Sequence, residues 1–153
     1  MPPKRTHSVK DIPGFEPVDV HPLPDNWISL CRKEINLNGF LCQDNSINVA
    51  RILAHEVTSD KILVISGLAY PPKKRSDGTT IQDAKIPRAH VWIRINSQDY
   101  DPTWGNHLGW NLTLAKYYAA FTTELQMIPE NIAEANCLPR LKTFAGSHGI
   151  DYK

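Results

Sequence analysis

The chain has 153 residues, of which 41% are hydrophobic and 22% charged, and 17 basic against 16 acidic side chains give a formal net charge of +1. This length suits one domain with a single core. The balanced charge excludes a general electrostatic attraction to nucleic acid or membranes, so we expect neither as a partner. The sequence contains no apolar run typical of a signal peptide or a membrane span, which favours a cytoplasmic protein.

The cysteine pattern argues against a disulfide framework. Cys31, Cys42 and Cys137 are odd in number and far apart in the sequence, and no Cys-x-x-Cys or His-x-x-x-His spacing indicates a zinc site. In a reducing compartment all three thiols stay free for chemistry. We therefore expect no metal and no cofactor, while the sequence does not indicate an oligomeric state.

The first 24 residues contain half of the twelve prolines, at positions 2, 3, 13, 17, 22 and 24. Proline lacks a backbone donor and disfavours regular structure. We expect an extended or disordered arm over residues 1–24, followed by one domain over residues 25–153.

Two helices are predicted at the start of that domain. The first begins after an N-cap at Asp25, and the second begins near Cys42 and runs to about His55. Apolar residues at helical spacing define one buried face on each. These are Trp27, Leu30, Cys31 and Ile35 in the first helix, and Ile47, Ala50, Leu53 and Ala54 in the second.

Strands are predicted in the middle of the chain. Residues 61–70 (KILVISGLAY) form a well-buried strand that ends at Pro71-Pro72. The polar residues 71–87 are either a lid or binding loop or a solvated excursion. Residues 89–95 and 99–104 predict the two strands of a hairpin.

Helical patterns are predicted in the last part of the chain, over residues 112–125 and 132–141, with Pro129 and Pro139 as breakers. The first of these helices is aromatic, and we expect it to line the wall of a cleft. Its aromatic residues are Tyr117, Tyr118 and Phe121.

Cys42 has the sequence context of a nucleophile. It follows a glycine-containing loop and begins a predicted helix, and polar residues follow it directly. The positive end of a helix dipole favours the thiolate form, and a neighbouring imidazole would complete the activation. Cys31 and Cys137, by contrast, are interpreted as small buried hydrophobic residues.

His90 and Asp101 are brought together by strand register. If Asn96-Ser97 is a two-residue hairpin turn, Arg94 faces Asp99, Trp92 faces Asp101, and His90 and Asp101 become diagonal neighbours on one face. An aspartate bonded to an imidazole fixes its tautomer and favours its charged form. The alternative is a His–Asp pair that only stabilises the hairpin.

The segment Ala89–Trp104 (AHVWIRINSQDYDPTW) resembles the histidine and aspartate motifs of the transglutaminase-like superfamily, in which a His-x-Trp strand precedes an Asp-Pro-Thr strand. Gly39–Ala54 (GFLCQDNSINVARILA) is similar to the family's catalytic cysteine at the start of its central helix. The resemblance covers roughly residues 39–104. It implies an α+β fold with a papain-like core, in which a helix bearing the cysteine packs on a small antiparallel sheet bearing the histidine and aspartate. It is typical of a small bacterial or phage member.

The resemblance also implies a function. Cys42 would be the nucleophile, His90 the base and acid, and Asp101 the orienting residue of an enzyme that hydrolyses or transfers acyl groups at amide-type bonds of a protein or peptide-like substrate. The Cys42 N–H and Asn38 are candidate donors to the oxyanion. Trp92 and Trp104 are candidate substrate-positioning residues.

Two other functions remain open. The first is an inactive transglutaminase-like binding module that engages a protein or nucleic-acid partner through Trp92, Trp104 and Trp110 with the basic residues 73–75. The second is a metal site formed by Cys42, His90 and Asp101, against which the single sulfur and single imidazole argue.

Overall fold

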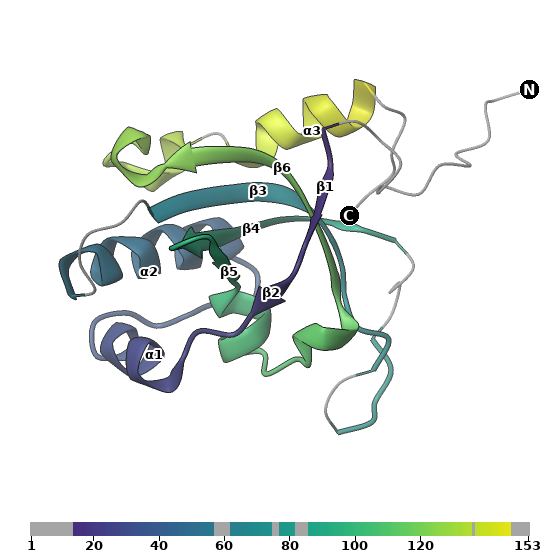
Figure 1. The fold of residues 1–153 in the computed structure, drawn as a ribbon, viewed down its shortest axis with the longest axis horizontal. Coiled ribbons are helices and arrows are strands. Elements are labelled where there is room, and N and C mark those ends of the chain that lie inside the picture. Colours follow the sequence, from purple (N-terminus) through teal and green to yellow (C-terminus); the bar gives the residue numbers. More distant parts are fainter. Residues whose placement is uncertain (1–13, 57–61, 75–76, 82–85, 136, 148–153) are drawn as a thin grey trace, which may run out of the picture.

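The computed structural model describes residues 14–56, 62–74, 77–81, 86–135 and 137–147. A six-stranded sheet in the order β1-β6-β3-β4-β5-β2 carries helices (Figure 1). The strands are β1 (Glu16–Val18), β2 (Val20–His21), β3 (Ile62–Tyr70), β4 (Arg88–Ile95), β5 (Gln98–Tyr100) and β6 (Lys116–Glu124). The helices are α1 (Asp25–Arg32), α2 (Cys42–Glu56) and α3 (Cys137–Ser147), with the short helical turns η2 (Pro102–His107), η3 (Leu112–Leu114), η4 (Leu125–Met127) and η5 (Ile132–Glu134).

The α+β class predicted from the sequence is confirmed. The sheet is mixed, because β2 pairs in parallel with β5 while the other strand pairs are antiparallel. Two layers of core lie on its two faces. The three α-helices pack against one face, while β2, η2 and η3 close over the other, so that the sheet curls around an aromatic cluster.

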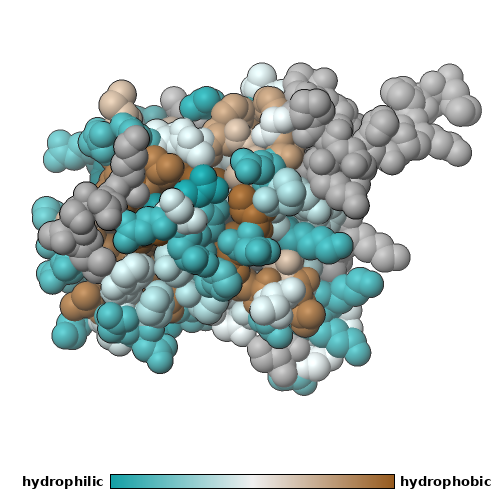
Figure 2. Space-filling view, in the orientation of Figure 1, coloured by the Kyte–Doolittle hydropathy of each residue, from teal (hydrophilic) through white to brown (hydrophobic). Residues whose placement is uncertain are grey.

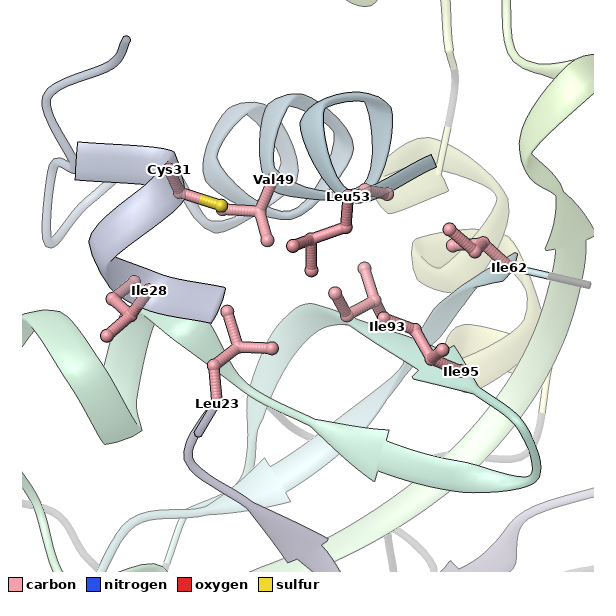
Figure 3. Packing of buried hydrophobic residues seen from close by; sticks show 9 residues of the cluster. Leu23, Ile28, Cys31, Val49, Leu53, Ile62, Ile93 and Ile95 are labelled. Carbon is pink, nitrogen blue, oxygen red and sulfur yellow. The ribbon is translucent and has the colours of Figure 1, made fainter. Parts of the chain in front are cut away.

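The first helices form the expected layer next to β4. In Figure 3, Leu23 lies near Leu53 of α2 and Ile93 of β4, and Ile28 of α1 belongs to the same buried cluster. Cys31 is fully buried in the same cluster, which confirms it as a core residue, and burial raises its pKa to about 11.

Several details of the two helices differ from the prediction. Pro24, not Asp25, is the N-cap of α1, and it makes no side-chain cap bond. Ile28 is buried in α1, whereas Trp27 and Leu30 are only partly buried. The bounds of α2 agree with the prediction, but Ala54 is exposed, so it does not belong to the buried face of this helix.

The β4–β5 hairpin has the predicted register. Arg94 pairs with Asp99, and the turn residues Asn96 and Ser97 have φ values of 53° and 66°. Two successive positive φ values define a type I′ turn, whose twist matches that of the flanking strands. The register that brings His90 toward Asp101 is therefore the one that the sequence indicates.

The second hairpin strand is shorter than predicted. It ends at Tyr100, and Pro102–His107 form a helical turn instead of continuing the strand to Trp104. Asp101 is the N-cap of this turn, and Pro102 occupies its first position. Asp at an N-cap and Pro at N1 are both favoured at helix starts, so the local sequence explains the change.

The predicted helix over residues 112–125 is wrong. Residues 112–114 form one short turn, and Lys116–Glu124 form the strand β6 between β1 and β3. The aromatic and β-branched residues of KYYAAFTTE favour a strand, and pairing with two neighbours on the sheet decides the outcome. Tyr117, Tyr118 and Phe121 thus belong to the sheet.

The predicted helix over residues 132–141 is displaced. Ile132–Glu134 form only a short turn, and α3 runs from Cys137 to Ser147. Pro139 lies in the first turn of α3, where a missing N–H breaks no helical hydrogen bond, so it does not act as a breaker.

Two further predicted segments, the N-terminal arm and the loop over residues 71–87, lie partly outside the described residues. Within the expected N-terminal arm, residues 14–24 are extended but join the sheet through β1 and β2, and Phe15 and Leu23 are buried. In the expected loop 71–87, Lys74 and Thr80 form an isolated bridge. A role of this loop as a lid stays a prediction.

Figure 2 shows the surface of the molecule in the orientation of Figure 1, where hydrophilic residues cover most of the side in view and hydrophobic residues form separate patches. Among the helices of the described segments, none has the length and apolar character needed to cross a bilayer.

Gly67 fixes the close approach of β3 to β6. A Cβ at this position would lie 2.1 Å from the carbonyl oxygen of Tyr118 and 2.7 Å from Cη2 of Trp92. We expect Gly67→Ala to lower the free energy of unfolding by about 2–3 kcal/mol, because the backbone oxygen cannot move without shifting a strand. Urea denaturation measures the effect.

Gly146→Ala is the matched control. Among the described residues, apart from its own helix backbone and chain neighbours, no atom lies within 4 Å of a Cβ built on this glycine near the end of α3. Its stability should be unchanged or increase by up to about 1 kcal/mol, because alanine has the higher helix propensity. Equal effects of the two substitutions would contradict the role given to Gly67.

Candidate active site

His90 and Asp101 form a buried pair. His90 lies on β4 and is 3% exposed, while Asp101 follows β5 and is fully buried. The His90 Nε2 atom lies 2.7 Å from Oδ2 of Asp101, which is the distance of a charge-assisted hydrogen bond. The two residues that the sequence predicts as neighbours are thus in direct contact.

The other oxygen of Asp101 is held by the backbone. Its Oδ1 accepts hydrogen bonds from the N–H groups of Thr103 at 2.9 Å and Trp104 at 3.1 Å. N–H groups at the start of a helical turn have no partner within the turn, and an aspartate at the N-cap accepts hydrogen bonds from them. The Asp-Pro-Thr sequence therefore does more than provide a carboxylate, because it also orients it.

Cys42 is the first residue of α2, as predicted, and it is partly buried. Its sulfur acts on the imidazole of His90 and raises the pKa of His90, so the two side chains lie close together. Because Nε2 of His90 is bonded to Asp101, Nδ1 is the ring nitrogen left for the sulfur. The structure therefore brings Cys42, His90 and Asp101 together in one chain of contacts.

Two buried polar residues of α2 hold the helix start in place. Ser46 Oγ donates to the carbonyl oxygen of Val91 at 2.9 Å, at an edge of β4 that β5 does not cover because their pairing begins at Ile93. Asn45 Nδ2 donates to Thr103 Oγ1 at 3.0 Å. Ser46 thus connects α2 to β4, which bears His90, and Asn45 connects α2 to η2, which follows Asp101.

The protonation of His90 follows from these contacts. Burial by itself lowers its pKa, but the charge of Asp101, the charge of Cys42 and hydrogen bonds to both raise it, with the net result that the pKa rises from 6.5 to about 10. The imidazole is therefore positively charged at neutral pH. A charged imidazole beside a sulfur favours the thiolate.

Aromatic rings enclose the imidazole. The Trp104 ring stacks on His90 with centroids 4.3 Å apart, and the rings of Trp92 and Tyr117 lie at 6.2 Å and 6.1 Å. Trp92 is itself fixed, because its Nε1 donates to Asp99, which also pairs with Arg94. The rings exclude water from the His90–Asp101 pair and strengthen its electrostatic interaction.

The tryptophans predicted as substrate-positioning residues lie behind the imidazole. Trp92 is fully buried and Trp104 is 3% exposed. Neither can stack on a partner at the surface, so the predicted binding surface retains only the partly buried Trp110 and the exposed Lys73 and Lys74 among the described residues.

Asn38 is exposed in the loop before Cys42. Its side-chain oxygen accepts from the Phe40 N–H at 2.9 Å, and its backbone groups bond to the side chain of Asn45. The carboxamide NH₂ group is what Asn38 can offer to a ligand, and its role as an oxyanion donor stays a prediction.

Sequence reasoning missed Asn45 and Ser46 as residues of this site, and it expected Tyr117 in the wall of a cleft but not at the carboxylate of Asp101. The polar run after Cys42 was a visible signal for the first two, because buried polar residues in a helix imply specific partners. Tyr117 gave no such signal, because its segment was assigned to a helix. Its hydroxyl lies 2.5 Å from Oδ2 of Asp101.

In the described segments, no group of three or more His, Cys, Asp or Glu side chains has a geometry that could hold a metal ion. The other two thiols lie in the core, and burial raises the pKa of Cys137. Cys42 is the thiol that combines partial exposure with an imidazole.

The raised pKa of His90 makes stability depend on pH. The folded protein binds the His90 proton more tightly than the unfolded chain, so the stabilisation is complete below about pH 6.5 and is lost as the pH rises toward 10. We expect the free energy of unfolding to fall over this window by at least about 1 kcal/mol more in the wild type than in His90→Gln. Urea denaturation between pH 6 and pH 10 measures the difference, with the range chosen around these pKa values.

His55→Gln is the matched control, since His55 is exposed near the end of α2. Its pH dependence should follow that of the wild type. If the free energy of unfolding changes with pH to the same extent in His90→Gln and in the wild type, folding does not raise the pKa of His90 as described.

Comparison of the chain with models of protein families, with curated proteins and with solved structures found no match. The function of the site must therefore be inferred from the chemistry of its own residues.

Proposed function

We propose that this protein is a thiol enzyme of the transglutaminase-like, papain-type kind, which hydrolyses amide-type bonds or transfers their acyl groups. The observation that carries the proposal is the buried 2.7 Å contact between His90 and Asp101, with Cys42 at a helix start acting on the same imidazole. A nucleophile beside a base that is itself hydrogen-bonded to an orienting carboxylate is the signature of an activated nucleophile.

The three side chains have distinct roles in the proposed reaction. The Cys42 thiolate attacks the substrate carbonyl carbon, and the free N–H of Cys42 at the start of α2 donates to the oxyanion. Asn38 is the candidate for the second donor. The His90 imidazolium then gives its proton to the departing amine, which leaves a thioester on Cys42.

The second half of the reaction reverses these roles. Water or an acceptor amine gives a proton to His90 as it attacks the thioester, and the Cys42 thiolate leaves. Asp101 keeps the ring oriented throughout. Water as the acceptor makes the enzyme a hydrolase, and an amine makes it a transferase.

The surface next to Cys42 fits a protein or peptide-like substrate. Phe40 and Leu41, the two residues before the nucleophile, are 97% and 47% exposed. Leu108 is 37% exposed and contacts this loop, because its Cδ2 would lie 3.2 Å from a Cβ on Gly39. Exposed apolar side chains around a reactive group are suited to contact with a polypeptide.

The same exposed side chains also favour a second candidate function, an inactive transglutaminase-like module that binds a partner without turnover. Phe40 would then serve binding only. The reactivity of Cys42 distinguishes the two functions, because a binding module has no need of an activated thiol.

The three free thiols agree with a reducing compartment, so we propose the cytoplasm as the location.

The enzyme function predicts selective alkylation of Cys42. With limiting iodoacetamide at pH 6–7, where an ordinary thiol with a pKa near 8.5 is mostly protonated, we expect Cys42 to react at least about 10-fold faster than a model thiol. Peptide mass spectrometry assigns the site, and the buried Cys31 and Cys137 are internal controls in the same molecule.

Two variants complete this test. His90→Ala should reduce the alkylation rate of Cys42 to that of a model thiol, whereas His107→Ala, an exposed histidine at the end of η2, should leave it unchanged. The enzyme proposal fails if Cys42 reacts no faster than the model thiol, or if the loss of His90 has no effect.

A further inference from the structure

Tyr117 has a position at this site that the three catalytic roles do not explain. Its hydroxyl donates to Oδ2 of Asp101, the same oxygen that binds His90, although Tyr117 comes from β6 and Asp101 follows β5. In the sheet, β3 and β4 separate these strands. The contact exists because the sheet curls and brings its two sides together over the aromatic cluster.

We infer that Tyr117 is a positioning residue that acts through Asp101: by sharing Oδ2 with His90, it weakens the hold of the carboxylate on the imidazole proton, so that His90 can release that proton. The inference rests on the proposed function for its purpose, because proton release to a leaving amine is the step that it serves. Its physical content, the effect of Tyr117 on the protonation of His90, can be tested separately.

The four donors on Asp101 divide into two kinds. Those on Oδ1 are the backbone N–H groups of Thr103 and Trp104, which orient the carboxylate without Tyr117. The hydroxyl on Oδ2 is therefore not required to place the carboxylate. Its distinct effect is to draw negative charge from the one oxygen that faces the imidazole.

The burial of the pair makes this effect strong. Asp101 is fully buried and Tyr117 is 3% exposed, so little water is present to screen the interaction. Burial, followed by the charge of Asp101, raises the pKa of Tyr117 well above its usual value. The hydroxyl therefore keeps its proton, and remains a donor, at any pH at which the protein works.

The ring of Tyr117 is held by its neighbours. Trp92 contacts it edge to face, with centroids 5.1 Å apart, and the Trp104 ring lies at 5.7 Å. The absence of a side chain at Gly67 makes room for the Trp92 ring. A phenylalanine at position 117 would keep these contacts and lose only the hydroxyl, so Tyr117→Phe isolates the hydrogen bond.

Within the described part of the chain, the titratable groups that face His90 are Asp101, Cys42 from α2 and Tyr117 from β6. The test therefore uses the full chain with Cys42→Ala, which removes the sulfur from the titration. The pKa of His90 is measured by NMR of its ring nitrogens as the pH is varied. We expect Tyr117→Phe in this background to raise that pKa by about 0.5–1 unit, which is part of the effect of one hydrogen bond to a charged group.

Tyr118→Phe is the control on the same strand. Tyr118 packs with Phe15 and Leu68 in the cluster on the helix side of the sheet, so the loss of its hydroxyl should leave the His90 titration unchanged. If Tyr117→Phe does not fold, 3-fluorotyrosine at position 117 replaces it. As a stronger donor, it should lower the pKa of His90.

The outcomes separate this inference from the proposed function. An unchanged or lowered pKa of His90 in Tyr117→Phe would overturn the inference, because a merely structural tyrosine does not change the titration. This result does not depend on the alkylation of Cys42. If Cys42 is alkylated rapidly but Tyr117→Phe does not change the titration of His90, the enzyme proposal stands and the role of Tyr117 is refuted. If Cys42 is alkylated slowly but Tyr117→Phe raises the pKa of His90, the role of Tyr117 stands and the enzyme proposal is refuted.

Discussion

The buried carboxylate of Asp101 is the constraint on which the rest of this structure depends. A buried charge without partners is strongly unfavourable, and Asp101 is fully buried. Two backbone donors, one imidazole and one hydroxyl satisfy it. These donors come from η2, β4 and β6, so the carboxylate can be buried only if the β4–β5 hairpin, the turn η2 that follows it and the strand β6 meet at one point.

The architecture supplies that meeting point. The short β5 ends at Tyr100, which lets the chain turn into η2 and leaves the edge of β4 open at Val91. The start of α2 occupies this edge, with Ser46 bonded to β4 and Asn45 to Thr103 of η2. Because the nucleophile begins the same helix, the contacts that place the helix also place the thiol beside the imidazole.

Much of the site could be predicted because it depends on local interactions. Hairpin register follows from the two turn residues, Asn96 and Ser97, so His90 and Asp101 were correctly expected on one face. The start of α2 at Cys42 follows from the loop before it. The end of β5 was not predicted, although Asp101 followed by a proline is a helix-start signal, because the alternation of the strand was extended past it.

The remaining features depend on contacts that single-residue preferences do not contain. The segment around Tyr117 has apolar residues at helical spacing, yet it is a strand because β1 and β3 lie on either side of it. The role of Gly67 depends on how closely β6 and Trp92 approach. The sequence by itself thus determined the α+β class, the Cys42 helix and the His90–Asp101 register, because each depends on interactions between near neighbours in the chain. Only the tertiary structure decided that β6 is a strand and that Tyr117 shares the Asp101 carboxylate, because both depend on the curl of the whole sheet.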